Sequence, residues 1–190
     1  QPYGVVAKIN AFNHPFRFCA EKAASALAAG NTVVVKPSQY TSASMLEFMK
    51  IFEQAGFPPG VVNVVTGTGS EIGTPLVEHP KVAKVAFTGS EETGVKVYES
   101  AARGIKRVTM ELGGKDPMIV CADANLARAA NGCVWGSLTN AGPVCMSVER
   151  VYVNESVYDD FVEKVVDKVA AVRQGEPSED CDIGAMTQLS

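Results

Sequence analysis

The sequence has few of the features that mark membrane and nucleic-acid-binding proteins. Its longest apolar runs, such as residues 32–35, are far shorter than the roughly 20 residues that span a bilayer. The net charge is −4, and no stretch is rich in lysine and arginine. Nucleic acids and anionic membranes need clustered positive charge, so we expect neither as a partner.

Cysteine is also scarce and unpatterned. The five cysteines lack the short repeated spacing of zinc ligands, and an odd number cannot all form disulfides with one another. We therefore expect reduced thiols in a cytoplasmic protein, without a metal site. Cys19, Cys121 and Cys133 lie in apolar runs and are expected in the core, whereas Cys181 lies in an acidic loop and is expected to be exposed.

The sequence does contain short β-branched runs that alternate with segments of helical spacing. Strands are expected at 5–9, 32–35, 61–65, 82–87 and 108–112, with helices at 15–29, 42–55, 71–78 and 91–102. This alternation predicts parallel β-α-β units in a Rossmann-like α/β fold, with helices on both faces of the sheet. Ligands of such folds bind beyond the carboxyl ends of the strands.

The same pattern restarts after residue 114. Strands are expected at 118–120 and 151–153, with helices at 126–138 and 156–173. Ser156, followed by Asp159, is the expected N-cap of the last helix.

Two stretches of the sequence suggest a nucleophile and a base. Residues 140–145 place Cys145 directly after an Asn/Gly/Pro turn, where a loop is expected. A loop suits an accessible thiol, although most unpaired cysteines are buried apolar residues. Residues 110–115 place Glu111 beside a flexible Gly-Gly pair. A glutamate there could activate the thiol, or the water that later releases a bound acyl group.

Several polar positions share a place relative to the predicted strands. Asn13, Lys36, residues 67–69, residues 89–90 and Glu111 all lie just past a strand. Because the carboxyl ends of parallel strands meet at one edge of the sheet, we expect these groups to line a common edge and form one site.

These motifs resemble those of a known family. In order along the chain, residues 12–15, 36–38, 87–90, 111–114 and the segment around Cys145 resemble the central part of the NAD(P)-dependent aldehyde dehydrogenase superfamily. The resemblance implies an NAD(P)-binding domain at 1–112 and a partial catalytic domain carrying the nucleophile at 113–190. The chain begins without Met and is shorter than family members, so the resemblance also implies a fragment, whose full-length form is expected to be a homo-oligomer.

The resemblance implies three catalytic residues. Cys145 would be the nucleophile, Glu111 the base that activates water, and Asn13 an amide donor to the oxyanion. From the residues alone, Asn13 fits better as a cap of the helix that begins near Pro15.

The resemblance also implies NAD or NADP as cofactor. The implied cofactor-binding residues are Phe12, Lys36, Ser38, Gln39, Gly69, Gly89, Ser90, Gly94, Leu112 and Gly113. Residues 89–94 open a helix, whose N-terminal amides favour a pyrophosphate. From the residues alone, Lys36 fits a solvated strand end equally well, and residues 67–69 fit a simple turn. Gln39 stands where NAD-preferring members commonly have glutamate, which leaves NAD and NADP both open.

The implied reaction is oxidation of an aldehyde to a carboxylic acid through a thiohemiacetal and a thioester. One alternative is an acylating dehydrogenase in which coenzyme A takes the acyl group, although a glutamate at position 111 favours hydrolysis. The other alternative is a nucleotide-binding fragment without turnover.

Overall fold

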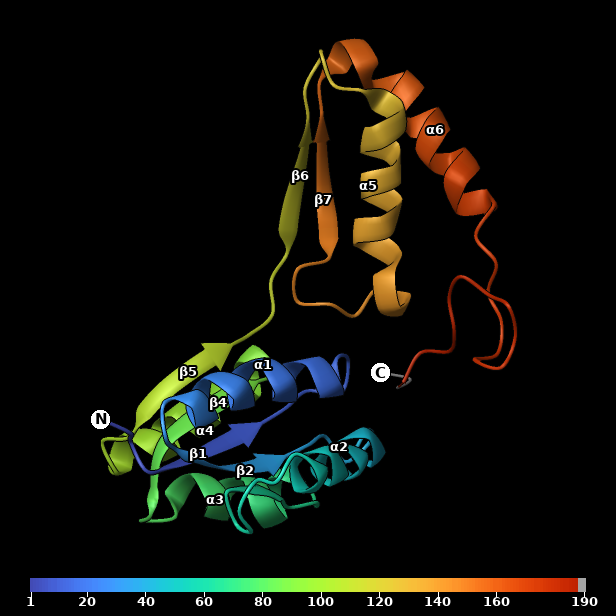
Figure 1. The fold of residues 1–190 in the computed structure, drawn as a ribbon. Helices are drawn as coiled ribbons and strands as arrows, with labels where there is room; N and C mark the ends of the chain where they lie inside the picture. The colour runs from blue at the N-terminus through green and yellow to red at the C-terminus, as the bar shows by residue number, and fades with distance from the viewer. Residues whose placement is uncertain (188–190) are drawn as a thin grey trace. The chain divides into compact units, whose positions relative to one another are not determined.

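The computed structural model describes residues 1–187, and the chain divides into two compact units, Gln1–Leu112 and Gly113–Ser190 (Figure 1). The first unit is built on a five-stranded sheet with the order β3-β2-β1-β4-β5, in which all neighbouring strands run parallel. Its strands are β1 (Val5–Ile9), β2 (Thr32–Lys36), β3 (Val62–Val64), β4 (Val82–Thr88) and β5 (Arg107–Glu111). The expected Rossmann-like α/β class is therefore confirmed.

Helices cover both faces of this sheet. Helices α1 (Pro15–Ala28) and α2 (Ala43–Gln54) pack on one face, where Cys19, Val35 and Met45 form part of a fully buried cluster. Helices α3 (Thr74–Glu78) and α4 (Glu91–Arg103) pack on the other face. The buried residues of that second cluster are Ala7, Ile9, Val77, Val82, Val85, Phe87 and Ala101.

Side chains alternate between the two faces along each strand. Ile9 and Phe87 contribute to the core under α3 and α4, so the adjacent Lys8 and Thr88 point to the face that α1 covers. Thr88 is the register partner of Glu111 on β5, which places Glu111 on the α1 face as well. The side chains of adjacent residues at the ends of these strands therefore point to opposite faces of the sheet.

The helix expected at 71–78 is divided in two. A π-helix (Gly69–Gly73) precedes α3. The helical segment begins earlier than expected because Thr68 and Glu71 form a capping box at its N-terminus. The Thr68 hydroxyl accepts the Glu71 N–H at 3.2 Å, and the Glu71 carboxylate accepts the Thr68 N–H at 3.3 Å.

The second unit has a parallel pair of strands, β6 (Asp116–Val120) and β7 (Val148–Val153), with α5 (Leu126–Leu138) and α6 (Tyr158–Ala170). Val120, Ala130, Cys133 and Phe161 form its buried core. Short 3₁₀ turns, η2 (Thr139–Ala141) and η3 (Glu155–Val157), follow α5 and precede α6.

Four expectations for this unit were wrong in detail. Strand β7 begins at Val148, three residues earlier than expected. The last helix, α6, begins at Tyr158, and its N-cap is Val157 and not Ser156. Ser156 lies in η3, which is capped by Asn154, whose side chain accepts the Ser156 N–H at 3.0 Å. Cys121 is exposed, since it follows β6 directly, whereas Cys19 and Cys133 are buried as expected. Cys181 is half-buried, with its thiol 3.5 Å from the Glu176 carbonyl oxygen.

Within residues 1–187, no helix combines the length and apolar character that crossing a membrane requires.

Candidate active site

Glu111, the expected base, is the last residue of β5. Its carboxylate accepts a hydrogen bond from the Lys22 ammonium of α1, with Oε1 2.8 Å from Nζ. The Lys22 and Glu111 side chains are 34% and 48% exposed, so water reaches the pair. The Gly89 N–H also donates to the Glu111 carbonyl at 3.1 Å, which fixes the end of β5 against the turn that opens α4. A half-exposed carboxylate fixed at a strand end can accept a proton from water.

Lys22 was missed by the sequence reasoning. It lies 89 positions from Glu111, and neither residue lies in a motif with the other. Its place on α1 does carry a signal, because Cys19 and Ala23 are both buried and Lys22 adjoins them on the helix surface. A lysine on the sheet-facing side of an amphipathic helix could therefore have been singled out.

Asn13 lies in the loop between β1 and α1 and is half-buried. The N-cap position of α1 belongs to the next residue, His14, which makes no side-chain cap hydrogen bond. The alternative role of Asn13 as the helix cap therefore does not hold. Phe12 is half-buried in the same loop.

Cys145 lies half-buried in the loop between η2 and β7. The buried Ser147 closes this loop: its hydroxyl donates to the Gly142 carbonyl at 2.6 Å, and its N–H donates to the Val144 carbonyl at 2.9 Å. Both bonds span Cys145 and hold the backbone on its two sides together. Cys145 therefore lies in a hydrogen-bonded loop, as the sequence of residues 140–145 predicts.

The backbone of the same loop takes a left-handed path. Asn140, Ala141 and Gly142 have φ values of 56°, 60° and 97°. Asn and Gly adopt this region readily, but alanine does so at a cost of about 1 kcal/mol. Strain of this kind persists where surrounding contacts hold the loop in place.

Of the two glycines that follow Leu112, only Gly114 is required sterically, because a Cβ at Gly113 would meet no atom within 4 Å. A Cβ at Gly114 would lie 3.2 Å from the Cys145 carbonyl oxygen and 2.9 Å from the Asp116 carboxylate. The backbone at Gly114 therefore passes closely against the cysteine loop, which a larger residue would displace. Gly113, expected to contact the cofactor, is exposed.

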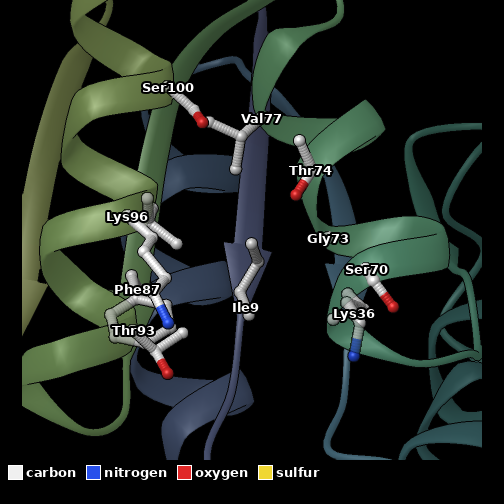
Figure 2. A pocket seen from close by; sticks show the side chains of 12 residues that line it. Ile9, Lys36, Ser70, Gly73, Thr74, Val77, Phe87, Thr93, Lys96 and Ser100 are labelled. Atoms are coloured by element: carbon white, nitrogen blue, oxygen red, sulfur yellow. The ribbon is translucent and has the colours of Figure 1, made fainter.

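A cavity of about 380 Å³ opens on the other face of the sheet, toward α3 and α4 (Figure 2). Lys36 and Gly69, two of the expected cofactor-binding residues, line it together. The Lys36 ammonium donates to the Pro37 carbonyl at 3.1 Å, and burial lowers the pKa of this lysine. Thr93 and Lys96 of α4 face the cavity from the opposite side (Figure 2).

Lys96 was not anticipated from the sequence. It forms an ion pair with Glu92 at 2.6 Å, one turn earlier on α4. That spacing is common on solvated helix surfaces and carries no functional signal, so only the cavity identifies Lys96 as a lining residue.

The turn between β4 and α4 brings the chain close to this cavity. A Cβ at Gly89 would lie 2.5 Å from the ring of Phe87, which lines the cavity, and a Cβ at Gly94 would lie 2.6 Å from a Leu112 methyl. Ser90 caps α4 by accepting the Thr93 N–H at 3.3 Å. The N-terminus of α4, a helix of thirteen residues, therefore brings together four expected cofactor-binding residues: Gly89, Ser90, Gly94 and Leu112.

Ser38 and Gln39 follow β2. The Ser38 hydroxyl accepts the Tyr40 N–H at 3.4 Å, and Gln39 is exposed. Neither is among the residues that line the cavity.

The expectation of a common edge holds for Lys36 and Glu111, but their side chains point to opposite faces of the sheet. Lys36 is the register partner of Ile9, and its side chain points to the face that α3 and α4 cover, whereas the Glu111 side chain points to the face that α1 covers. Both residues end their strands at the carboxyl edge, but strand alternation points their side chains to opposite sides of the sheet. Asn13 and Glu111 belong to the first unit and Cys145 to the second.

The whole sequence, residues 1–190, matches the model of the aldehyde dehydrogenase family. The chain belongs to this family. The structure is similar to that of an NAD-dependent aldehyde dehydrogenase from Sinorhizobium meliloti, with 44% identity and a TM-score of 0.97 over 99% of this chain. It is also similar to lactaldehyde dehydrogenase from Escherichia coli, with 41% identity and a TM-score of 0.96 over 100% of this chain.

A third similar structure is a mutant aldehyde dehydrogenase C from Pseudomonas syringae in complex with NAD⁺ and octanal, with 35% identity and a TM-score of 0.95 over 100% of this chain. This chain spans 38%, 40% and 39% of the lengths of these three solved chains. The aldehyde dehydrogenases similar to this chain include NAD-dependent members and members in complex with nicotinamide cofactors.

Proposed function

We propose that the protein oxidises an aldehyde to a carboxylic acid with NAD⁺ or NADP⁺, using Cys145 as nucleophile and Glu111 as base. The observation that carries the proposal is the half-exposed Glu111 carboxylate, held 2.8 Å from the Lys22 ammonium at a strand end, in a chain of this family. A carboxylate in that setting suits the hydrolysis of an acyl intermediate.

The first chemical step uses Cys145. Its thiolate sulfur attacks the aldehyde carbon and forms a C–S bond, while the carbonyl electron pair moves to oxygen and gives an oxyanion. The Asn13 side-chain amide and the Cys145 backbone N–H donate hydrogen bonds to that oxygen. Preorganised donors of this kind contribute about 3 kcal/mol each.

The lined cavity fits a nicotinamide dinucleotide. It offers the Lys36 ammonium, hydroxyl groups and apolar walls, and it lies beside the N-terminal amides of α4. A volume of about 380 Å³ is within the range of small-molecule sites and admits part of a dinucleotide. Gly89 and Gly94 let the turn and the start of α4 pack closely against Phe87 and Leu112. When bound, the cofactor supplies the acceptor for the hydride that leaves the substrate carbon.

Glu111 completes the reaction. Its carboxylate takes a proton from water as the water oxygen attacks the thioester carbon, the C–S bond breaks, and Cys145 leaves as a thiolate with the acid as product. This role separates the proposal from an acylating dehydrogenase, in which a coenzyme A thiol would attack in place of water.

The test is a single-turnover experiment on the full-length protein. Excess enzyme is mixed with NAD⁺ or NADP⁺ and a panel of aldehydes, and the absorbance of reduced nicotinamide is followed. We expect a rapid burst that is lost in Cys145→Ala and retained in Cys121→Ala, which removes an exposed thiol of the same unit.

Other outcomes would replace the proposal. A burst that survives Cys145→Ala would assign the nucleophile elsewhere. Measurable nucleotide binding without a burst for any aldehyde would leave a nucleotide-binding protein. Product release that requires added coenzyme A would favour the acylating reaction.

A further inference from the structure

Lys8, the fourth of the five residues of β1, is a buried cation that the reaction above does not use. Lys8 is only 1% exposed, and the other residues of β1 are apolar. Its ammonium donates to the Thr88 hydroxyl at the end of β4, with Nζ 2.9 Å from Oγ1. Within residues 1–187 it makes no ion pair, although burying an unpaired ammonium is costly.

The surroundings of Lys8 connect it to Glu111. Thr88, its hydrogen-bond partner, is the register partner of Glu111, and the next residue, Gly89, donates its N–H to the Glu111 carbonyl at 3.1 Å. Lys8 therefore holds the strand end to which the backbone of Glu111 is bonded.

The titratable groups around Lys8 come from two elements. Helix α1 presents Cys19, Glu21 and Lys22, and β5 presents Glu111. Burial lowers the pKa of Lys8 to about 8, with the Lys22 charge acting in the same direction. Burial raises the pKa of the Cys19 thiol to about 11, so this thiol stays neutral where Lys8 titrates.

We propose that Lys8 is a positioning residue for Glu111, because it holds the end of β4 through its hydrogen bond to Thr88. This inference rests on the proposed function of Glu111.

The proposal predicts a particular pH dependence of hydrolysis. Below pH 8 the charged Lys8 donates to Thr88 and holds the end of β4, to which the backbone of Glu111 is bonded. As the pH rises through about 8, Lys8 loses its proton. The hydrogen bond to Thr88 then loses its charged donor, Glu111 is held less firmly, and the rate of hydrolysis should fall in a step of about twofold.

The test uses p-nitrophenyl acetate, which acylates a thiol without any cofactor. Cys145 attacks the ester carbon, p-nitrophenolate leaves, and the acetyl thioester is hydrolysed by water with Glu111 as base. A burst of p-nitrophenolate reports acylation, and the following steady rate reports hydrolysis. Both are measured from pH 5 to 10 on the full-length protein.

We expect Lys8→Met to keep the burst, to lower the rate of hydrolysis by about twofold below pH 8, and to remove the step near pH 8. Lys84→Met is the matched control, because Lys84 lies on β4 on the same face of the sheet and has Tyr3 as its contact. It should reproduce the wild-type profile. Lys8→Arg, which keeps the charge, should keep the wild-type rate below pH 8 and remove only the step.

A second variant tests the hydrogen bond itself. Thr88→Val removes the acceptor of Lys8 and leaves the ammonium in place, so the step should be lost. This variant decides the proposal alone if Lys8→Met does not fold.

The outcomes separate the two proposals. A Lys8→Met profile that superimposes on the wild type, or a step that stays in place in Thr88→Val, would overturn the role of Lys8 and leave that of Cys145 intact. A wild-type protein without a burst would overturn the thiol chemistry, and the role of Lys8 with it.

Discussion

The burial of Lys8 makes its charge a cost to the folded state. Burial moves the pKa of this lysine from 10.5 to about 8, and the residue is 1% exposed. A depression of that size corresponds to about 3 kcal/mol, because one pKa unit is about 1.4 kcal/mol. We predict that Lys8→Met is more stable than the wild type by up to about 3 kcal/mol at pH 7, as measured by urea unfolding.

The sign of the pH dependence follows from the two pKa values. The penalty is fully present below the folded pKa of about 8 and is relieved as the pH rises toward 10.5, because the unfolded chain then binds more protons. The advantage of Lys8→Met should therefore shrink between pH 8 and pH 10. A difference that stays constant over this range would show that Lys8 keeps its proton in the folded protein as it does in the unfolded chain, so that its pKa is not lowered.

The Lys8 and Lys22 contacts also mark the limit of the sequence at the residue scale. Lys8 finds its partner 80 positions away, and Lys22 finds Glu111 89 positions away. Local patterning places each lysine on a strand or helix, but it does not say which distant strand end comes within hydrogen-bond distance. Cys145 and Glu111 could be singled out because each lies in a turn or motif of its own.

At the scale of elements, the turn between β4 and α4 depends on Gly89. A Cβ there would lie 2.5 Å from the buried Phe87 ring, which lines the cavity, so the ring would have to move. We predict that Gly89→Ala lowers the free energy of unfolding by about 1–3 kcal/mol and weakens NAD(P) binding at least tenfold. Thermal unfolding and calorimetric titration measure the two effects.

Gly132→Ala is the matched control for this change. Gly132 lies inside α5, and a Cβ there would have no neighbour within 4 Å. Alanine is the better helix former, so this variant should gain about 0.5–1 kcal/mol. Equal losses for both variants would refute the steric role of Gly89.

Most elements of the first unit could be predicted, because each strand is a short β-branched run and each main helix has its own apolar period. The exceptions are places where one side-chain hydrogen bond decides the local structure. In the first unit, the Thr68–Glu71 capping box fixes where the π-helix begins; in the second unit, the Asn154 side chain caps the 3₁₀ turn before α6. Both bonds join residue types that are also common in loops, so the residue types alone do not predict these caps.

At the scale of the whole molecule, each compact unit contains one buried cysteine. Cys19 is fully buried in the first unit, and Cys133 is 7% exposed in the second. Thiol labelling followed by mass spectrometry can therefore report the opening of each unit separately. Cys121 is exposed and serves as an internal standard for the reagent.

We predict that NAD(P)⁺ protects Cys19 more than Cys133. The lined cavity belongs entirely to the first unit, and a ligand at about 100 times its Kd stabilises the form that binds it by about 2.7 kcal/mol. Labelling of Cys19 in mild denaturant should then slow by up to about 100-fold. Equal protection of both thiols would mean that the units unfold together, and no protection would place the nucleotide elsewhere.

The alternation of side chains along β1 and β4 also bears on how such a protein diverges. Ile9 and Phe87 line the cavity that we propose for the nucleotide, while the adjacent Lys8 and Thr88 point to the other face of the same sheet, as does Glu111, the base that we propose. Under these proposals, substitutions at one set alter the choice of nucleotide, and substitutions at the other alter the rate of hydrolysis. We then expect cofactor preference and acyl-transfer chemistry to diverge nearly independently, although they share the same two strands.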